Sequence, residues 1–336
     1  MVRKLLTIAV LATTVLTGCQ NTAPKTELTI VTTFFPYYVF VKNIVGDNAN
    51  VVNLIQNSED PHEYQLKPSD LSLLVNANIV IKNGLGLDDW IDDAVKNSGS
   101  QAKIITGSTP IQPLAAPELT EVVHDEAHED DDHGDLDPHV WLSPKNASKI
   151  VTALSSQIDA IDTTHDYQEA TQSYLTRLQK LDNDIRTLLT DTKTKEFVSF
   201  HPAFHYFAND YGLKNTLAIE PFPGKEPTPR YLTTMITLIK EKQLKAIFSE
   251  PQFSPRIVET LALDLNLQVF SLDPMETGTY TATAYEDISR QNATTMHTAL
   301  TLGMTGSLLP MLVSLLITRP SSMISRSLSI LAKLSG

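Results

Sequence analysis

The stretch LTIVTTFFPYYVFVKNIVGDNANVVNLI, residues 28–55, decides the fold predicted for this chain. It opens with an alternating, β-branched run over 28–33, which predicts a strand. From 36 to 44 apolar residues recur every three or four positions, as in an amphipathic helix, and Gly46 ends that pattern. A second strand is expected over 49–55. Two strands joined by a helix predict parallel pairing.

The same alternation of strands and helices continues and returns in the second half of the chain. Between the halves, apolar residues from Tyr167 to Leu188 keep spacings of three and four without glycine or proline, which predicts one long helix. The expected fold class is α/β, with two βα lobes built on parallel sheets and joined by a long rigid helix. The predicted divisions are a signal peptide at 1–18, a tether at 19–27, an N-terminal lobe at 28–144, connecting helices at 145–192, a C-terminal lobe at 193–300 and an atypical apolar extension at 301–336.

The segment GLGLDDW, from Gly84 to Trp90, has two glycines in three residues. It lacks the third glycine and the following helix of a dinucleotide-binding fingerprint. A tight turn is therefore predicted here in place of a phosphate cradle.

The N-terminus has the layout of an export signal. Arg3 and Lys4 precede an apolar run that is too short to span a bilayer comfortably. The run ends in Leu-Thr-Gly-Cys19, which resembles the cleavage box of bacterial lipoproteins. We therefore expect Cys19 to be lipidated and the protein to be extracytoplasmic and anchored to the cell membrane. Cys19 is the only cysteine, so any metal site must use nitrogen and oxygen ligands.

Charge excludes one class of partner. The net charge of −13 argues against nucleic-acid binding, which requires a basic surface. Much of the acidity lies in residues 118–137, where His124, His128 and His133 stand among Asp and Glu. This composition predicts an accessory loop that binds zinc weakly and raises its concentration near the protein. The alternative is a solvated acidic linker with incidental histidines.

Three other histidines share one local pattern. His62 lies in DPHEYQ, His139 in DPHVWL and His201 in FVSFHPAF, each beside a proline and near a predicted strand end or a turn next to a helix start. In open α/β sheets ligands bind outside the carboxyl ends of the strands, so these side chains are expected to converge in the cleft between the lobes. A preceding Asp can orient the imidazole. His205, one helical turn after His201, is interpreted as a helix-face residue, and His165 and His297 as structural.

A carboxylate for the same site is available in SLDPME, residues 271–276. Three imidazoles and one carboxylate make a plausible tetrahedral zinc site, whereas manganese prefers more oxygen ligands.

From about Leu28 to Leu300 the chain resembles the zinc- and manganese-specific solute-binding lipoproteins of bacterial ABC importers, the ZnuA-like family. The resemblance rests on DPHEY at 60–64, DPHVWL at 137–142, FHPAF at 200–204, and EPQF at 250–253 followed by LDP at 272–274. It implies two lobes joined by a long helix, with the metal buried between them. It further implies metal ligation by His62, His139 and His201, which places the chain on the zinc branch, with Asp273 as the preferred fourth ligand and Glu276, or water, as the alternative.

The protein is expected to act as a monomer that captures Zn(II), the transported ligand. It would deliver the ion to an ABC permease with an ATPase subunit. Alternatives are a manganese-binding member of the family and, less favoured, an exported zinc hydrolase; a role in cell adhesion is left open. Against an enzyme, the chain has no His-Glu-x-x-His, because in HDEAH at 124–128 the Glu is misplaced.

Residues 298–318, TALTLGMTGSLLPMLVSLLIT, depart from the family pattern. They carry no charge and could just span a bilayer, although Pro310 and two glycines weaken that interpretation. The preferred hypothesis is a non-homologous extension, produced by a shifted reading frame and appended to a complete domain.

Overall fold

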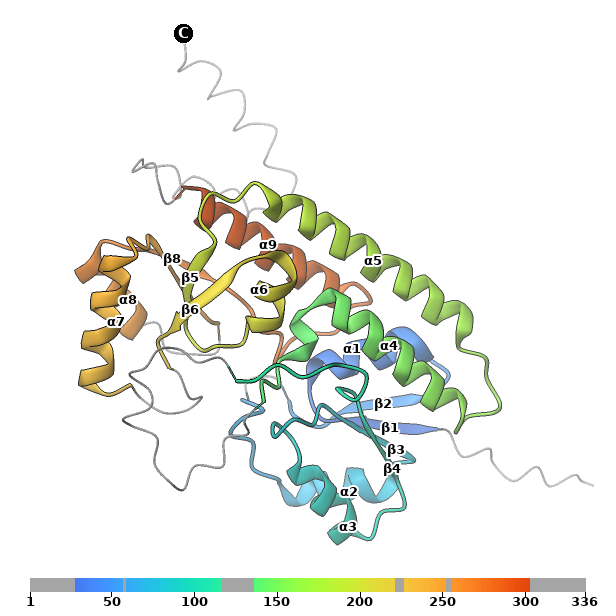
Figure 1. Cartoon of the computed structure of the whole chain (residues 1–336). Coiled ribbons are helices and arrows are strands. Elements are labelled where there is room, and N and C mark those ends of the chain that lie inside the picture. The colour runs from blue at the N-terminus through green and yellow to red at the C-terminus, as the bar shows by residue number, and fades with distance from the viewer. Residues whose placement is uncertain (1–27, 57–58, 117–135, 221–226, 252–255, 303–336) are drawn as a thin grey trace, which may run out of the picture.

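A computed structural model of the chain describes residues 28–56, 59–116, 136–220, 227–251 and 256–302 (Figure 1). The predictions made for Cys19, for His124, His128 and His133, and for the extension beyond residue 302 lie outside these ranges. The described part contains two lobes, each built on a four-stranded parallel sheet, so the predicted fold class is confirmed. The residue boundaries of the lobes remain a prediction.

The first sheet is formed by β1 (Thr29–Thr32), β2 (Asn50–Asn53), β3 (Ile79–Lys82) and β4 (Lys103–Thr106) in the order β2-β1-β3-β4. All three pairings are parallel. The chain passes from β1 to β2 through α1 (Phe35–Val45), which begins with a proline in its first turn and ends at Gly46. α2 (Pro68–Asn76) and α3 (Trp90–Ser98) connect the other strands. The strand order reverses at β1, which opens a crevice at the carboxyl ends of the strands.

The second sheet repeats this topology. β5 (Glu196–Ser199), β6 (Lys214–Ala218), β7 (Ala246–Ser249) and β8 (Gln268–Ser271) are parallel and follow the order β6-β5-β7-β8. The connecting helices are α6 (His205–Tyr211), α7 (Pro229–Glu241) and α8 (Arg256–Leu265), and α9 (Ala284–Leu302) follows β8. A single buried cluster runs through the first lobe, the connecting helices and part of the second lobe, so the lobes share much of their core.

The chain passes between the lobes through a 3₁₀ turn, η2 (Val140–Leu142), then α4 (Pro144–Asp159) and α5 (Gln168–Thr190). α5 is the predicted long helix, and it runs beside α4 and α9 (Figure 1). It buries a stripe of side chains at helical spacing, Tyr174, Leu178, Leu181, Ile185 and Leu189. This helix also contacts α1 of the first lobe and α6 and α9 of the second, so it joins the two lobes.

The glycine-rich segment after β3 is the tight turn that the sequence predicts, but a helix does follow it, because α3 begins at Trp90. Gly84, Leu85 and Gly86 all have positive φ angles, and the Asp88 carboxylate accepts the backbone N–H groups of Asn83 and Gly84. A Cβ on Gly84 would lie 2.7 Å from the Thr106 side chain, so both the space and the backbone angle require glycine there.

Among the described residues, none of the helices has the length and apolar character needed to cross a membrane.

Candidate metal centre

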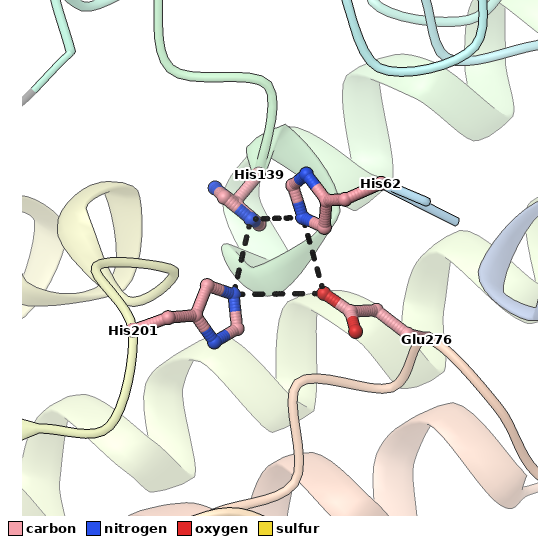
Figure 2. A group of neighbouring side chains, drawn as sticks. All are labelled: His62, His139, His201 and Glu276. Atoms are coloured by element: carbon pink, nitrogen blue, oxygen red, sulfur yellow. Dashed lines mark hydrogen bonds and ion pairs between the residues drawn. The ribbon is translucent and has the colours of Figure 1, made fainter. Parts of the chain in front are cut away.

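Four side chains from four separate segments meet between the lobes (Figure 2). His62 follows β2, His139 immediately precedes η2, His201 follows β5 and Glu276 follows β8. Each ligand-bearing segment therefore lies beyond a strand end or next to a helical turn, as the sequence predicts. The parallel sheets place these ends on the same side of each lobe, which is why residues so distant in sequence can meet.

The donor atoms form a cluster of zinc-site dimensions. His139 Nε2 lies 3.2 Å from His62 Nε2 and 3.3 Å from His201 Nε2. Glu276 Oε1 lies 3.5 Å from His62 Nε2 and 3.6 Å from His201 Nε2. A tetrahedral zinc with bonds of ~2.05 Å would separate its ligand atoms by about 3.3 Å. These four separations are close to that value, and all four donor atoms lie within 4.8 Å of one another, so the three Nε2 atoms and one carboxylate oxygen could hold a single ion.

The cluster is almost completely removed from solvent. The side chains of His139, His201 and Glu276 are 5%, 1% and 2% exposed, whereas that of His62 is 15% exposed. A buried carboxylate is stable only when it is paired, and here its partners are imidazoles. His62 is the side chain through which the site is open to solvent.

Two of the imidazoles are oriented by carboxylates that contact their other nitrogen. Asp137 Oδ1 lies 2.7 Å from His139 Nδ1 and also accepts the backbone N–H of His139. Glu250 makes the same pair of contacts with His201, at 2.6 Å from Nδ1 and 3.1 Å from the backbone nitrogen. A proton held on Nδ1 leaves Nε2 as the lone-pair donor that a metal needs.

The third carboxylate, Asp60, acts differently. Asp60 accepts the backbone N–H of His62 and so shapes the turn that carries the ring. The expected orienting role of the preceding Asp is thus met for His139 through its ring and for His62 through its main chain. The role of Glu250 was not foreseen, although it was quoted within a family motif; its position directly after β7 was the available signal.

Local electrostatics shifts the pKa values of His139 and His201 in opposite directions. Burial lowers the pKa of His139 and exceeds the opposing effect of Asp137, so this ring is neutral at neutral pH. Burial also lowers the pKa of His201, but the charges of Glu250, Glu276 and Asp60 outweigh it and raise the pKa to about 9. Burial raises the pKa of Glu276, yet the surrounding imidazoles reverse this and lower it overall. The metal-free centre therefore pairs a carboxylate with an imidazolium.

The structure reverses the preference between the two candidate carboxylates. Glu276, the alternative, lies in the cluster, whereas Asp273, the first choice, does not. Asp273 Oδ1 accepts the backbone N–H of Met275, and this turn places Met275 at a φ of 61°. The short Asp side chain is therefore used to bend the main chain, and the bend directs the longer Glu276 side chain toward the histidines.

The remaining described histidines lie outside the cluster. His205 Nδ1 is 3.4 Å from the Oδ2 atom of Asp137, and its side chain is a third exposed, as expected for a helix-face residue. His165 contacts Asp162 in the turn between α4 and α5. His297 is half-buried on α9.

Comparison with known proteins agrees with this geometry. The family model described as "ZnuA: Zinc-uptake complex component A periplasmic" matches residues 30–299. The chain belongs to this family.

Individual members of the ZnuA family show the extent of the similarity. The "High-affinity zinc uptake system protein ZnuA" of Bacillus subtilis is 31% identical over 269 residues, covering 77% of this chain and 84% of that protein. The "Zinc-binding lipoprotein AdcA" of Streptococcus pneumoniae strain R6 is also 31% identical, over 275 residues, but the chain spans only 55% of its length. A zinc-bound crystal structure of a ZnuA deletion mutant superposes with a TM-score of 0.71 at 27% identity, covering 82% of this chain and 98% of that chain. The predicted zinc-branch resemblance is thus confirmed at the level of family.

Proposed function

We propose that this protein is the extracytoplasmic binding component of an ABC importer, which captures Zn(II) and delivers it to a membrane permease energised by an ATPase subunit. One observation carries the proposal: the donor atoms of His62, His139, His201 and Glu276 lie within 4.8 Å of one another, close enough to share one ion, and come from both lobes. The zinc-uptake names of its relatives support the same function.

The ligand set favours zinc over its competitors. Three nitrogen donors and one oxygen donor suit tetrahedral Zn(II), whereas Mn(II) prefers sites rich in oxygen. A catalytic zinc site keeps one position for water, but four protein donors leave no such position. The zinc-transport interpretation therefore explains the complete donor set better than the manganese or hydrolase alternatives do.

Capture and release follow from the division of ligands between lobes. His62 and His139 come from the N-terminal side and His201 and Glu276 from the C-terminal lobe, so a small movement of one lobe breaks half of the shell. α5 packs against both lobes and limits that movement. We further propose that the protein acts as a monomer tethered through lipidated Cys19, and that His124, His128 and His133 gather zinc near the cleft.

The test is native mass spectrometry of the chain from residue 20 onward, purified without metal and offered equal Zn(II) and Mn(II). We expect one tightly held zinc, lost in His139→Ala and retained in His165→Ala, the matched control outside the cluster. Deleting residues 121–133 should leave that zinc in place. Retention of manganese instead, or no retained metal, would refute the proposal.

Delivery needs a cellular test. Cells that lack the protein should stop growing in zinc-depleted medium, and wild-type protein, but not His139→Ala, should restore growth. Replacing Cys19 with Ser should release the protein from the membrane fraction. Restored growth with His139→Ala would separate zinc uptake from the proposed centre.

A further inference from the structure

We infer that Trp141 is a positioning residue for the metal centre, because its indole N–H holds the loop that carries Glu276 in register with His139. This inference rests on the proposed zinc site and adds to it a determinant of affinity that is not itself a metal ligand.

The contacts of Trp141 join two ligand-bearing segments. Trp141 follows His139 by two residues, is completely buried, and packs its ring 5.2 Å from the imidazole, centroid to centroid. Its Nε1–H donates to the carbonyl oxygen of Pro274 at 2.8 Å, and Pro274 precedes Glu276 by two residues. The main-chain oxygen of Trp141 accepts the hydroxyl of Tyr285 on α9 at 2.7 Å. One residue therefore ties the His139 segment to two parts of the C-terminal lobe.

Hydrogen bonds fix the main chain of the three residues that precede Glu276. Asn292 on α9 brackets Asp273, donating to its carbonyl oxygen at 2.7 Å and accepting its N–H at 2.9 Å. Asp273 in turn accepts the N–H of Met275. Both interactions stay within the C-terminal lobe. Of these described contacts, the bond from Trp141 to Pro274 is the one that comes from a segment bearing a histidine.

This arrangement gives the indole N–H a specific effect. Without it, the Asp273 turn still forms and the loop is still joined to the His139 segment indirectly, through α9 and the Tyr285 hydroxyl, but the direct bond between Pro274 and the His139 segment is lost. A functional constellation must be held within about 0.5 Å of its productive geometry. Loss of the indole N–H should therefore weaken the binding of zinc by Glu276. The three imidazoles should stay in place, because Asp137, Glu250 and the Asp60 turn support them.

The experiment measures zinc dissociation constants by chelator competition on the full chain. Trp141→Phe removes the donor and retains an aromatic ring beside Phe34, whose centroid is 4.8 Å away. We expect about a tenfold rise in the dissociation constant, in line with the loss of one buried hydrogen bond. Trp90→Phe is the matched control, because Trp90 Nε1 is buried without a hydrogen-bond partner among the described residues; its constant should stay within about twofold of wild type.

A double-mutant cycle separates positioning from general stability. If Trp141 acts through the carboxylate, Trp141→Phe should have almost no further effect on zinc affinity in a Glu276→Gln background. Bound Co(II) gives a second readout, since its visible absorption reports coordination geometry, and Trp141→Phe should change that spectrum whereas Trp90→Phe should not. A merely structural tryptophan would give additive effects and an unchanged cobalt spectrum.

The outcomes can be told apart. If Trp141→Phe does not fold, the single remaining tryptophan of the Trp90→Phe protein can be replaced biosynthetically by benzothienylalanine, an isostere without the N–H, with the same expected loss. Wild-type affinity in either Trp141 variant, or additivity in the cycle, would overturn the inference while leaving the zinc site intact. Failure of the wild-type protein to bind zinc would refute the proposed function itself.

Discussion

Replacing Glu250 with Gln should remove the proton that zinc displaces from the centre. Glu250 Oε2 lies 2.6 Å from His201 Nδ1, and both side chains are 1% exposed. Burial alone would lower the pKa of His201, but the neighbouring carboxylates, Glu250 foremost, raise it to about 9. In the metal-free protein at pH 7.5, His201 should therefore be mostly protonated. Zinc needs the Nε2 lone pair, so binding must release this proton.

The magnitude and sign follow from that pKa. Since the folded pKa of His201 lies above its unfolded value of ~6.5, the charged ring stabilises the metal-free protein fully below pH ~6.5. This contribution, about 3 kcal/mol, is lost as pH rises through about 9. Zinc affinity changes in the opposite direction: its dissociation constant should fall about tenfold for each pH unit between ~6.5 and ~9, where zinc replaces one proton.

Glu250→Gln keeps the shape of the side chain and removes its charge. The pKa of His201 should fall, so zinc binding at pH 7.5 should release almost no proton and the pH dependence should flatten. Affinity at high pH should still drop about 10- to 100-fold, because the ring loses its orienting carboxylate.

Titration calorimetry in buffers of different ionisation enthalpy counts the released protons directly. The wild-type slope should be close to one proton, and the Glu250→Gln slope close to zero. Asp137→Asn is the control: the pKa of its partner His139 is already lowered by burial, so the proton count should not change. Equal proton release from wild type and Glu250→Gln would refute the reasoning, as would a wild type that releases none.

Three further outcomes are expected. Glu276→Gln should raise the zinc dissociation constant more than tenfold in chelator competition. Asp273→Asn should change it by no more than about twofold, because the Asn oxygen can still accept the Met275 N–H. A larger loss for Asp273→Asn than for Glu276→Gln would restore Asp273 as the ligand. Arg177→Ala removes the guanidinium that lies 2.7 Å from Glu286, a carboxylate only 2% exposed. This change should lower the free energy of unfolding in urea by about 1–3 kcal/mol and leave the zinc stoichiometry unchanged. An unaltered urea midpoint would contradict this prediction. Zinc at 100 times its dissociation constant should stabilise the fold by ~2.7 kcal/mol, seen in calorimetry as a rise in melting temperature that EDTA reverses. No change in melting temperature would count against a site made by the folded state.

The sequence was informative wherever a local pattern carries the chemistry. Alternating β-branched and helical segments predicted both parallel sheets, and the unbroken stripe from Tyr167 to Leu188 predicted α5. The Asp-Pro-His pattern pointed to His62 and His139, because proline restricts the backbone beside each ring. His62 follows β2, so the parallel topology also places it at the end of the sheet that meets the cleft.

The rest of the site depends on contacts that no local pattern reveals. Asp273 and Glu276 are both acidic and close together, and only the turn made by the Asp273 side chain decides which of them faces the histidines. Glu250 meets His201 from 49 residues away, and Trp141 meets Pro274 from 133 residues away. The first pair is fixed by the pairing of β5 with β7 in one sheet and the second by the packing of the two lobes, and spacing in the sequence encodes neither.

The wide spacing of the four donors along the chain has a consequence for folding. His62 and His139 are 77 residues apart, and His139 and His201 are 62 apart, so each contact closes a long loop. Closing such a loop in an unstructured chain is opposed by roughly 4 kcal/mol of entropy. A nascent or proteolysed fragment that lacks any of the four segments cannot complete the set of donors and should not hold the ion tightly. Zinc retention thus reports that synthesis and folding of both halves are complete, and a single cut between the donors should release the ion once the pieces separate.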